Sequence, residues 1–173
     1  TFWSQYAYQF AHEFCHILCG FDNDRSKHEW FEEMICETAS LFAMRAMSKA
    51  WKNDAPYPNW VDYRHALKKY ADDVIEKRPK VSKKDLAAYY IENREELHKT
   101  TTNRELNGAI ASVFLEWFEA EPKHWESIRW INPSPAAADE DFGDYLKKWR
   151  EAAPERHKEF IQRIADAFGE ELD

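Results

Sequence analysis

Apolar residues recur along this chain with the spacing of α-helices. In the stretch 26–51 they fall every three or four positions, at Phe31, Met34, Ile35, Thr38, Leu41, Phe42 and Ala46. This spacing is typical of a helix that buries one face. No stretch alternates between apolar and polar residues for the length that a strand needs. The pattern therefore predicts a mainly α fold built from successive helices.

Capping residues, glycines and prolines indicate where these helices begin and end. They predict helices over 4–19, 26–51, 59–75, 82–98, 102–117, 122–130, 141–151 and 154–168. Gly20 ends the first helix, and capping-box pairs open three others: Ser26 with Glu29, Ser82 with Asp85, and Thr102 with Glu105. The only candidate linker, 133–139, is short, so we expect one domain over 1–173.

The composition favours a folded, acidic domain. The chain has 173 residues, of which 44% are hydrophobic and 16% aromatic, enough for a sizeable core. We place one aromatic set in that core: Trp117, Phe118, Trp125, Trp130, Trp149, Phe160 and Phe168. A net charge of −8 argues against nucleic acid as a partner, because phosphate binding needs a basic surface. No apolar run approaches the ~20 residues of a membrane span.

The cysteines bear on the cellular location of the protein, and the first residue bears on whether a further domain precedes it. Three cysteines, Cys15, Cys19 and Cys36, cannot all pair, and no secretory leader is present. This favours free thiols in a reducing compartment, so we expect a cytoplasmic protein. Cys15 and Cys19 are interpreted as small apolar core residues. The chain begins with Thr1 instead of Met, so an additional domain upstream is possible.

The sequence His12-Glu13-Phe14-Cys15-His16 has the pattern HExxH. Positions four apart share a helix face, so both imidazoles can bind one metal ion. Glu13 then reaches a metal-activated water and acts as general base. In a chain of this composition, HExxH arises by chance in roughly 3% of cases. We expect the apolar neighbours Phe14, Ile17 and Leu18 to bury the motif.

A second motif lies on the next helix. Trp30 precedes Glu33 by three positions, Cys36 follows it by three, and Glu37 by four. With HExxH upstream, this pattern resembles the gluzincin zinc metallopeptidases, the thermolysin-like and aminopeptidase-like enzymes. The resemblance covers about residues 8–44. It implies a helical zincin-like domain, with residues 1–58 holding the zinc-site helices and 59–173 forming a helical C-terminal part.

The resemblance also assigns roles to the glutamates. It implies that Glu33 is the third zinc ligand and that Glu37 orients a ligand imidazole. The alternative, with Glu37 as the ligand and Ser40 as the small residue after it, stays open. Glu29 and Glu32 are expected to be solvated. The family usually has a small sheet before the HExxH helix, and here only 11 residues precede His12, so those strands are absent or upstream.

A proton donor is expected from the segment after the second helix. The sequence 57–65 offers His65, Tyr63 and Tyr57, and we favour His65 and Tyr63 over Tyr57. In gluzincin-like hydrolysis such a side chain stabilises the oxyanion. The expected activity is zinc-dependent hydrolysis of a peptide bond, with a peptide or protein as substrate.

Two alternatives remain at the level of sequence. His12, His16, Cys19 and Cys36 could form a closed structural zinc site with four protein ligands and no open position. Separately, the protein could be a catalytically silent helical protein-interaction domain that keeps a structural or vestigial zinc site and acts by binding.

Overall fold

The computed structural model describes residues 2–20, 27–135, 137 and 139–172. Over these ranges the chain forms α-helices and short 3-10 helices, and no strand. The elements follow the order α1 (Phe2–Leu18), α2 (Glu29–Ala50), η1 (Pro58–Tyr63), α3 (Arg64–Glu76), η2 (Lys83–Asp85), α4 (Leu86–Lys99), α5 (Arg104–Ala120), η3 (Pro122–Trp130), α6 (Phe142–Ala152) and α7 (Glu155–Phe168). The expectation of a mainly α protein is confirmed.

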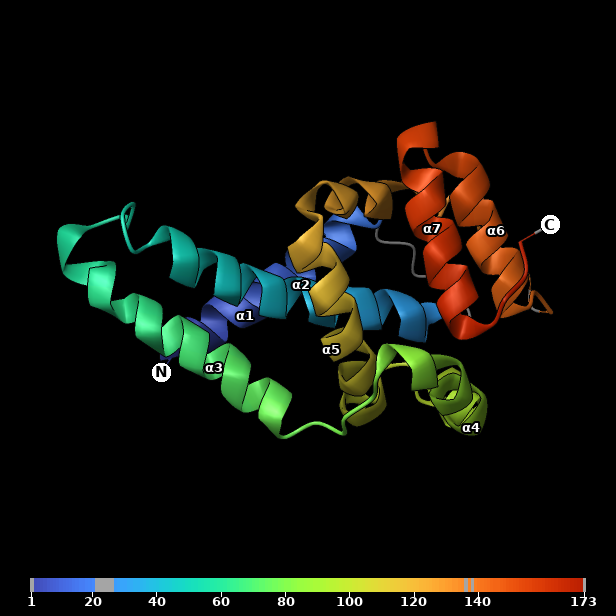
Figure 1. Cartoon of the computed structure of the whole chain (residues 1–173), viewed down its shortest axis with the longest axis horizontal. Coiled ribbons are helices and arrows are strands. Elements are labelled where there is room, and N and C mark those ends of the chain that lie inside the picture. Colours follow the sequence, from blue (N-terminus) through green and yellow to red (C-terminus); the bar gives the residue numbers. More distant parts are fainter. Residues whose placement is uncertain (1, 21–26, 136, 138, 173) are drawn as a thin grey trace.

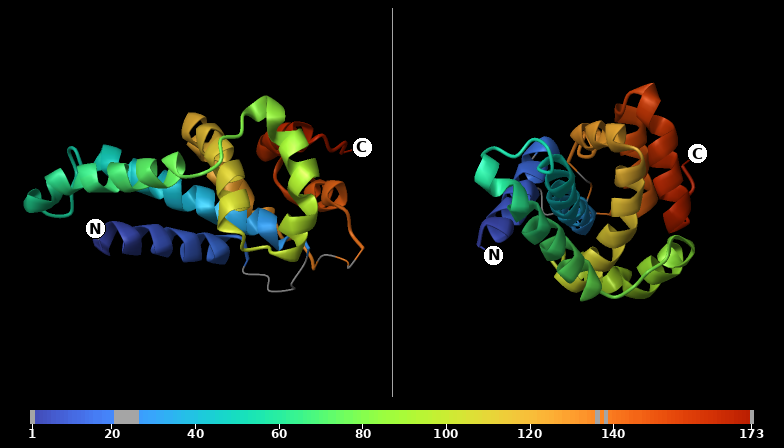
Figure 2. Two further views of the ribbon diagram at one scale, coloured as in Figure 1. Left: turned by 90° about the horizontal axis from the view of Figure 1, so that it is seen from below. Right: turned by 60° about the vertical axis from the view of Figure 1, so that its left-hand side comes forward.

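The helices form an elongated molecule organised around α2. In one half α1 and α3 pack along α2, and in the middle α5 crosses it (Figure 1). The hairpin of α6 and α7 packs at the other end, next to α4. Turned views show α1 on the outside of the molecule, with α2 on its inner side (Figure 2).

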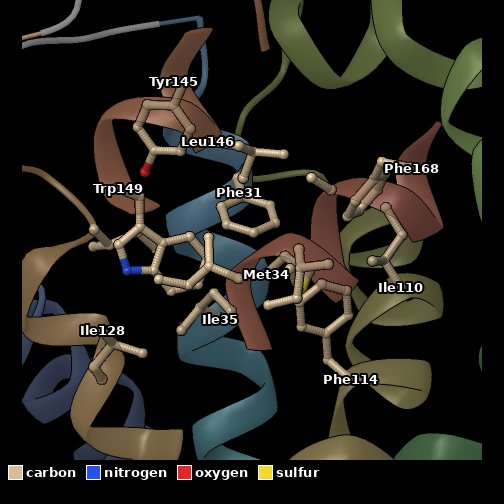
Figure 3. Packing of buried hydrophobic residues seen from close by; sticks show 14 of the residues in the cluster. Phe31, Met34, Ile35, Ile110, Phe114, Ile128, Tyr145, Leu146, Trp149 and Phe168 are labelled. Atoms are coloured by element: carbon tan, nitrogen blue, oxygen red, sulfur yellow. The ribbon is translucent and has the colours of Figure 1, made fainter. Parts of the chain in front are cut away.

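Helix α2 is buried on almost every side. Phe31, Met34 and Ile35 project from it into a cluster with side chains of α5, η3, α6 and α7 (Figure 3). Phe31 and Trp149, which approach each other from α2 and α6, are both 0% exposed. Burying one such side chain contributes about 1.5–3 kcal/mol. This packing holds α2, and therefore the glutamates on it, in a fixed position.

Helix α1 is packed on one side only. It ends where expected: Gly20 has a φ of +92°, and its N–H donates to the carbonyl of Ile17. The expectation that Phe14, Ile17 and Leu18 bury the motif is wrong, because they are 46%, 63% and 41% exposed. These residues lie on the outer flanks of α1, whereas the histidines of the motif face α2.

The helix caps differ in detail from the expected ones. Ser26 lies outside the described residues, and α2 begins at Glu29 after His28. The cap of α5 is Asn103 instead of Thr102, because the Asn103 carboxamide oxygen accepts from two N–H groups of the first turn. Both side chains are good caps, and backbone geometry decides which one is in reach.

Two other expectations are confirmed. Cys15, Cys19 and Cys36 are free and buried in the core. The aromatic set predicted for the core lies there, with Trp125 and Trp130 partly buried against it and the other five buried. Within the described chain, no helix combines the length and apolar character needed to cross a membrane.

Candidate metal centre

Helices α1 and α2 bring two imidazoles and a carboxylate to one point. The Nε2 atoms of His12 and His16, one helical turn apart, are 3.3 Å from each other. Glu33 faces them from α2, with one oxygen 3.3 Å from His12 Nε2 and the other 3.5 Å from His16 Nε2. The three side chains thus offer two nitrogens and an oxygen around one position.

These separations fit a zinc ion. A tetrahedral zinc with bonds of about 2.0–2.1 Å requires donor atoms about 3.3 Å apart. The donor set, two neutral imidazoles and one carboxylate, is also one that catalytic zinc uses. All three side chains are mostly buried, with exposed fractions of 14–17%. His12, His16 and Glu33 could therefore hold zinc with little rearrangement.

The second nitrogen of His16 is held by Glu32. The distance from His16 Nδ1 to the Glu32 carboxylate is 2.6 Å, and the other Glu32 oxygen accepts from Asn132 Nδ2 at 2.5 Å. The expectation that Glu32 is solvated is wrong, since it is 7% exposed. The burial of Glu32 could have been predicted from the sequence, because apolar residues lie on all sides of α2. A charged side chain on such a helix needs a partner.

The second nitrogen of His12 faces Glu37. The distance from His12 Nδ1 to Glu37 Oε2 is 3.6 Å, longer than an ordinary hydrogen bond. The other Glu37 oxygen accepts from the Arg78 guanidinium and from the Tyr8 hydroxyl. Glu33 therefore lies at the Nε2 atoms of the two histidines, and Glu37 lies on the opposite side of the His12 ring.

Tyr8 and Arg78 are site residues that the sequence reasoning missed. Burial raises the pKa of Tyr8 to about 12, so its hydroxyl remains a hydrogen-bond donor at neutral pH. Arg78 follows α3, 41 positions after Glu37 along the chain. Tyr8 lies one turn before His12, and helical spacing could have indicated it. Nothing in the sequence links Arg78 to this site.

His16 and Glu33 form a charged pair at the centre. Hydrogen bonds with Glu32 and then Glu33 raise the pKa of His16 to about 10, although burial opposes this. Burial would raise the pKa of Glu33, but hydrogen bonds from His12 and His16 outweigh it and lower that pKa to about 2. Without metal, His16 is therefore protonated at neutral pH next to ionised Glu33. A metal cation would take the place of that proton.

Glu13 borders a polar cleft beside the three donors. The cleft has a volume of about 300 Å³, and its wall includes His12, Glu13, Glu33 and Tyr70. Glu13 is exposed, and one of its carboxylate oxygens accepts from Gln9 Nε2 at 2.5 Å. A carboxylate that is free to reach into such a cleft can exchange protons with a molecule bound there.

The structure does not bring the expected proton donors to this cleft. The Tyr63 hydroxyl accepts from the backbone N–H of Ser4, about two helical turns before His12, and Tyr63 lines a different, apolar cavity. His65 is exposed on α3. Tyr57 is 61% exposed and packs against Trp60. Two other tyrosines, Tyr8 and Tyr70, line the cleft instead.

The three cysteines form a donor group of their own, and His16 also comes close to one of them, Cys36. The sulfur of Cys19 joins those of Cys15 and Cys36, all within 4.8 Å of one another. In the described part of the chain, His12 and His16 share a donor group with Glu33 and not with Cys19. The geometry therefore favours the open three-ligand arrangement over the closed set of two histidines and two cysteines.

A large apolar cavity lies on the other flank of α1. It has a volume of about 920 Å³ and is lined mainly by aromatic and aliphatic side chains, among them Phe10, Phe42, Trp51 and Trp125. On the adjoining outer face of α1, Trp3, Tyr6 and Phe10 are 64–70% exposed. None of the three metal-binding donors borders this cavity.

Comparisons of the chain with family models, with curated proteins and with solved structures found no match. Arguments about function therefore rest on the two motifs and on the geometry of the described side chains.

Proposed function

We propose that this protein is a gluzincin-like zinc metallopeptidase, in which His12, His16 and Glu33 hold the zinc ion in a helical zincin-like domain. The observation that carries this proposal is the convergence of the three side chains: the two Nε2 atoms are 3.3 Å apart, and each lies within 3.5 Å of one of the two Glu33 oxygens. Three protein ligands leave one position of a tetrahedron open, which is the arrangement of catalytic zinc.

Carboxylates lie at the second nitrogens of both histidines. Glu32 is hydrogen-bonded to Nδ1 of His16, and Glu37 faces Nδ1 of His12 at 3.6 Å. The bond to Glu32 leaves Nε2 of His16 to face the metal and makes this imidazole a stronger ligand. Arg78 and Tyr8 in turn hold Glu37. Side chains beyond the three ligands thus help to orient them, as an ordered metal site requires.

The bound ion supplies a Lewis acid that lowers the pKa of water and polarises a carbonyl group. Glu13 contributes the proton transfers. Its carboxylate lies at the edge of the cleft that also contains His12 and Glu33, so it can take a proton from the attacking water. It then delivers this proton to the amine that leaves when the peptide bond breaks.

The test is Glu13→Gln, with bound metal and peptide hydrolysis measured on the same samples. The variant should keep one zinc per chain and lose hydrolysis of a mixed peptide library by about 10²-fold or more, because the general base is gone. His12→Ala should lose both. Glu159→Gln, a matched change on the exposed face of α7, should lose neither.

Three results would contradict the proposal in different ways. Cleavage that is unchanged in Glu13→Gln would overturn the role of Glu13 as base. A wild-type protein that holds zinc and cleaves no peptide or protein would overturn the catalytic step, and would favour the silent interaction domain. A chain that binds no zinc would overturn the metal centre itself.

A further inference from the structure

A second group of potential metal ligands lies beside the first and consists only of thiols. Cys15 and Cys19 are one helical turn apart, joined by a hydrogen bond from the Cys19 N–H to the Cys15 carbonyl. Cys36 faces them from α2, and the three sulfur atoms lie within 4.8 Å of one another. Each of these residues is at most 2% exposed.

We propose that Cys15, Cys19 and Cys36 form a three-sulfur site for monovalent copper, Cu(I), separate from the site of His12, His16 and Glu33. The cluster does not depend on the proposed peptidase activity, because it shares no ligand with that centre.

The three sulfur atoms need to move only slightly to bind one metal ion. Three atoms no more than 4.8 Å apart all lie within about 2.8 Å of a common point, since 4.8/√3 ≈ 2.8. Metal–thiolate bonds are about 2.3 Å long. A shift of about 0.5 Å by each sulfur therefore brings all three to bonding distance, which side-chain torsions can provide.

The number and kind of ligands favour Cu(I). Thiolates are soft ligands that select Cu(I), zinc or iron–sulfur clusters. Structural zinc takes four protein ligands, and iron–sulfur clusters are typically held by four cysteines. Cu(I) is satisfied by three thiolates in a plane.

Among the residues that the structure describes, no fourth ligand is free next to the sulfurs. Donor atoms of His16 and Glu32 do come within 4.8 Å of the Cys36 sulfur. However, His16 Nδ1 is bonded to Glu32, and its Nε2 faces His12 and Glu33. Both oxygens of Glu32 are also engaged, one by His16 and one by Asn132.

Cu(I) can reach the cluster from the apolar cavity, and its binding should stabilise the protein. Cys15 forms part of the wall of the apolar cavity of about 920 Å³, so a thiol-bound Cu(I) ion can approach from that side. Each cysteine that ligates gives up its proton, and the copper charge offsets part of the negative charge that results. Bound copper would join α1 to α2 and should raise the melting temperature of the protein.

The experiment is an anaerobic titration of the reduced chain with Cu(I)–bicinchoninate, in the wild type and in His12→Ala. Both should take one Cu(I) from the chelator, because the site does not use His12. X-ray absorption should show a shell of three sulfurs at about 2.3 Å. Cys36→Ala and Cys19→Ala should each lower the affinity at least about tenfold, since two sulfurs remain.

Controls separate this site from other outcomes. Met47→Leu, which removes a sulfur from the same apolar cavity, should leave the affinity unchanged. If a cysteine variant fails to fold, the sulfur shell of the wild type still decides the question. The proposal is overturned if wild type takes up no copper, if nitrogen or oxygen atoms form the shell, or if the cysteines close a disulfide instead.

Discussion

At the scale of single residues, the centre depends on which atom of each side chain faces which neighbour. Glu32 and Glu33 are adjacent in sequence, yet they hold opposite sides of the same His16 ring. Successive residues on a helix point about 100° apart, so α2 can offer one carboxylate to each ring nitrogen. The sequence motif suggests Glu33 as a ligand. The role of Glu32 in orienting His16 follows only from its contact to Nδ1 in the structure.

Glu32→Gln should lower the affinity for zinc about tenfold, because His16 Nδ1–H no longer donates its hydrogen bond to a full carboxylate. Equilibrium competition with a zinc chelator measures this directly. The matched control is Glu29→Gln, one turn earlier on α2, where the carboxylate accepts from Thr101. Equal losses in the two variants would show that Glu32 acts only through the overall charge of the helix.

At the scale of elements, the centre lies between two helices that differ in how deeply they are buried. Helix α2 is held on nearly every side by the core, whereas α1 packs mainly on α2 and exposes its other face. The end of α1 is fixed by Gly20, whose φ of +92° lies in the region that favours glycine. This turn follows the motif by four residues and sets where the helix stops.

Gly20→Ala should therefore lower the free energy of unfolding by about 1 kcal/mol, because an alanine is strained at this φ. A Cβ at this position would have nothing within 4 Å, so the whole effect comes from the backbone. Urea unfolding measures it. Gly20→Asn should lose less, since asparagine tolerates the left-handed region better than alanine does. Equal losses for alanine and asparagine would contradict the backbone explanation.

At the scale of the whole molecule, the main core and the metal centre are largely separate. The packed cluster of Phe31, Phe114, Trp149 and Phe168 involves α2, α5, α6 and α7 and contains no zinc ligand. A zinc ion held by His12, His16 and Glu33 would join only α1 to α2. The protein should thus be stabilised by zinc without depending on zinc to fold.

Removal of zinc with a chelator should lower the melting temperature by about 10 °C and leave a cooperative transition. Free zinc at a thousand times its dissociation constant contributes about 4 kcal/mol, and each kcal/mol corresponds to about 2–4 °C in a chain of this size. Calorimetry with and without chelator measures the shift, which should vanish in His12→Ala. Loss of the transition altogether would indicate a structural zinc site.

Much of the fold followed from local patterns. Helical spacing, Gly20 and the prolines predicted the helices to within a few residues, because these signals act over one or two turns. Caps are predicted less well: the capping pair is expected to begin at Thr102, whereas Asn103, one position further on, caps α5. The exposure of Phe14 and Ile17 was missed, since spacing shows that a face is apolar and not whether another element covers it.

For the candidate site, the sequence by itself determined which side chains share a face of their own helix. It placed His12 and His16 on one face of α1 and offered Glu33, with Glu37 as the open alternative, on the next helix. Only the tertiary structure decided which groups meet across elements: Glu32 at His16, Arg78 and Tyr8 at Glu37, and Tyr63 and His65 outside the cleft. The physical reason is that periodicity sets the direction of a side chain on its own helix, whereas its partners depend on how the helices pack.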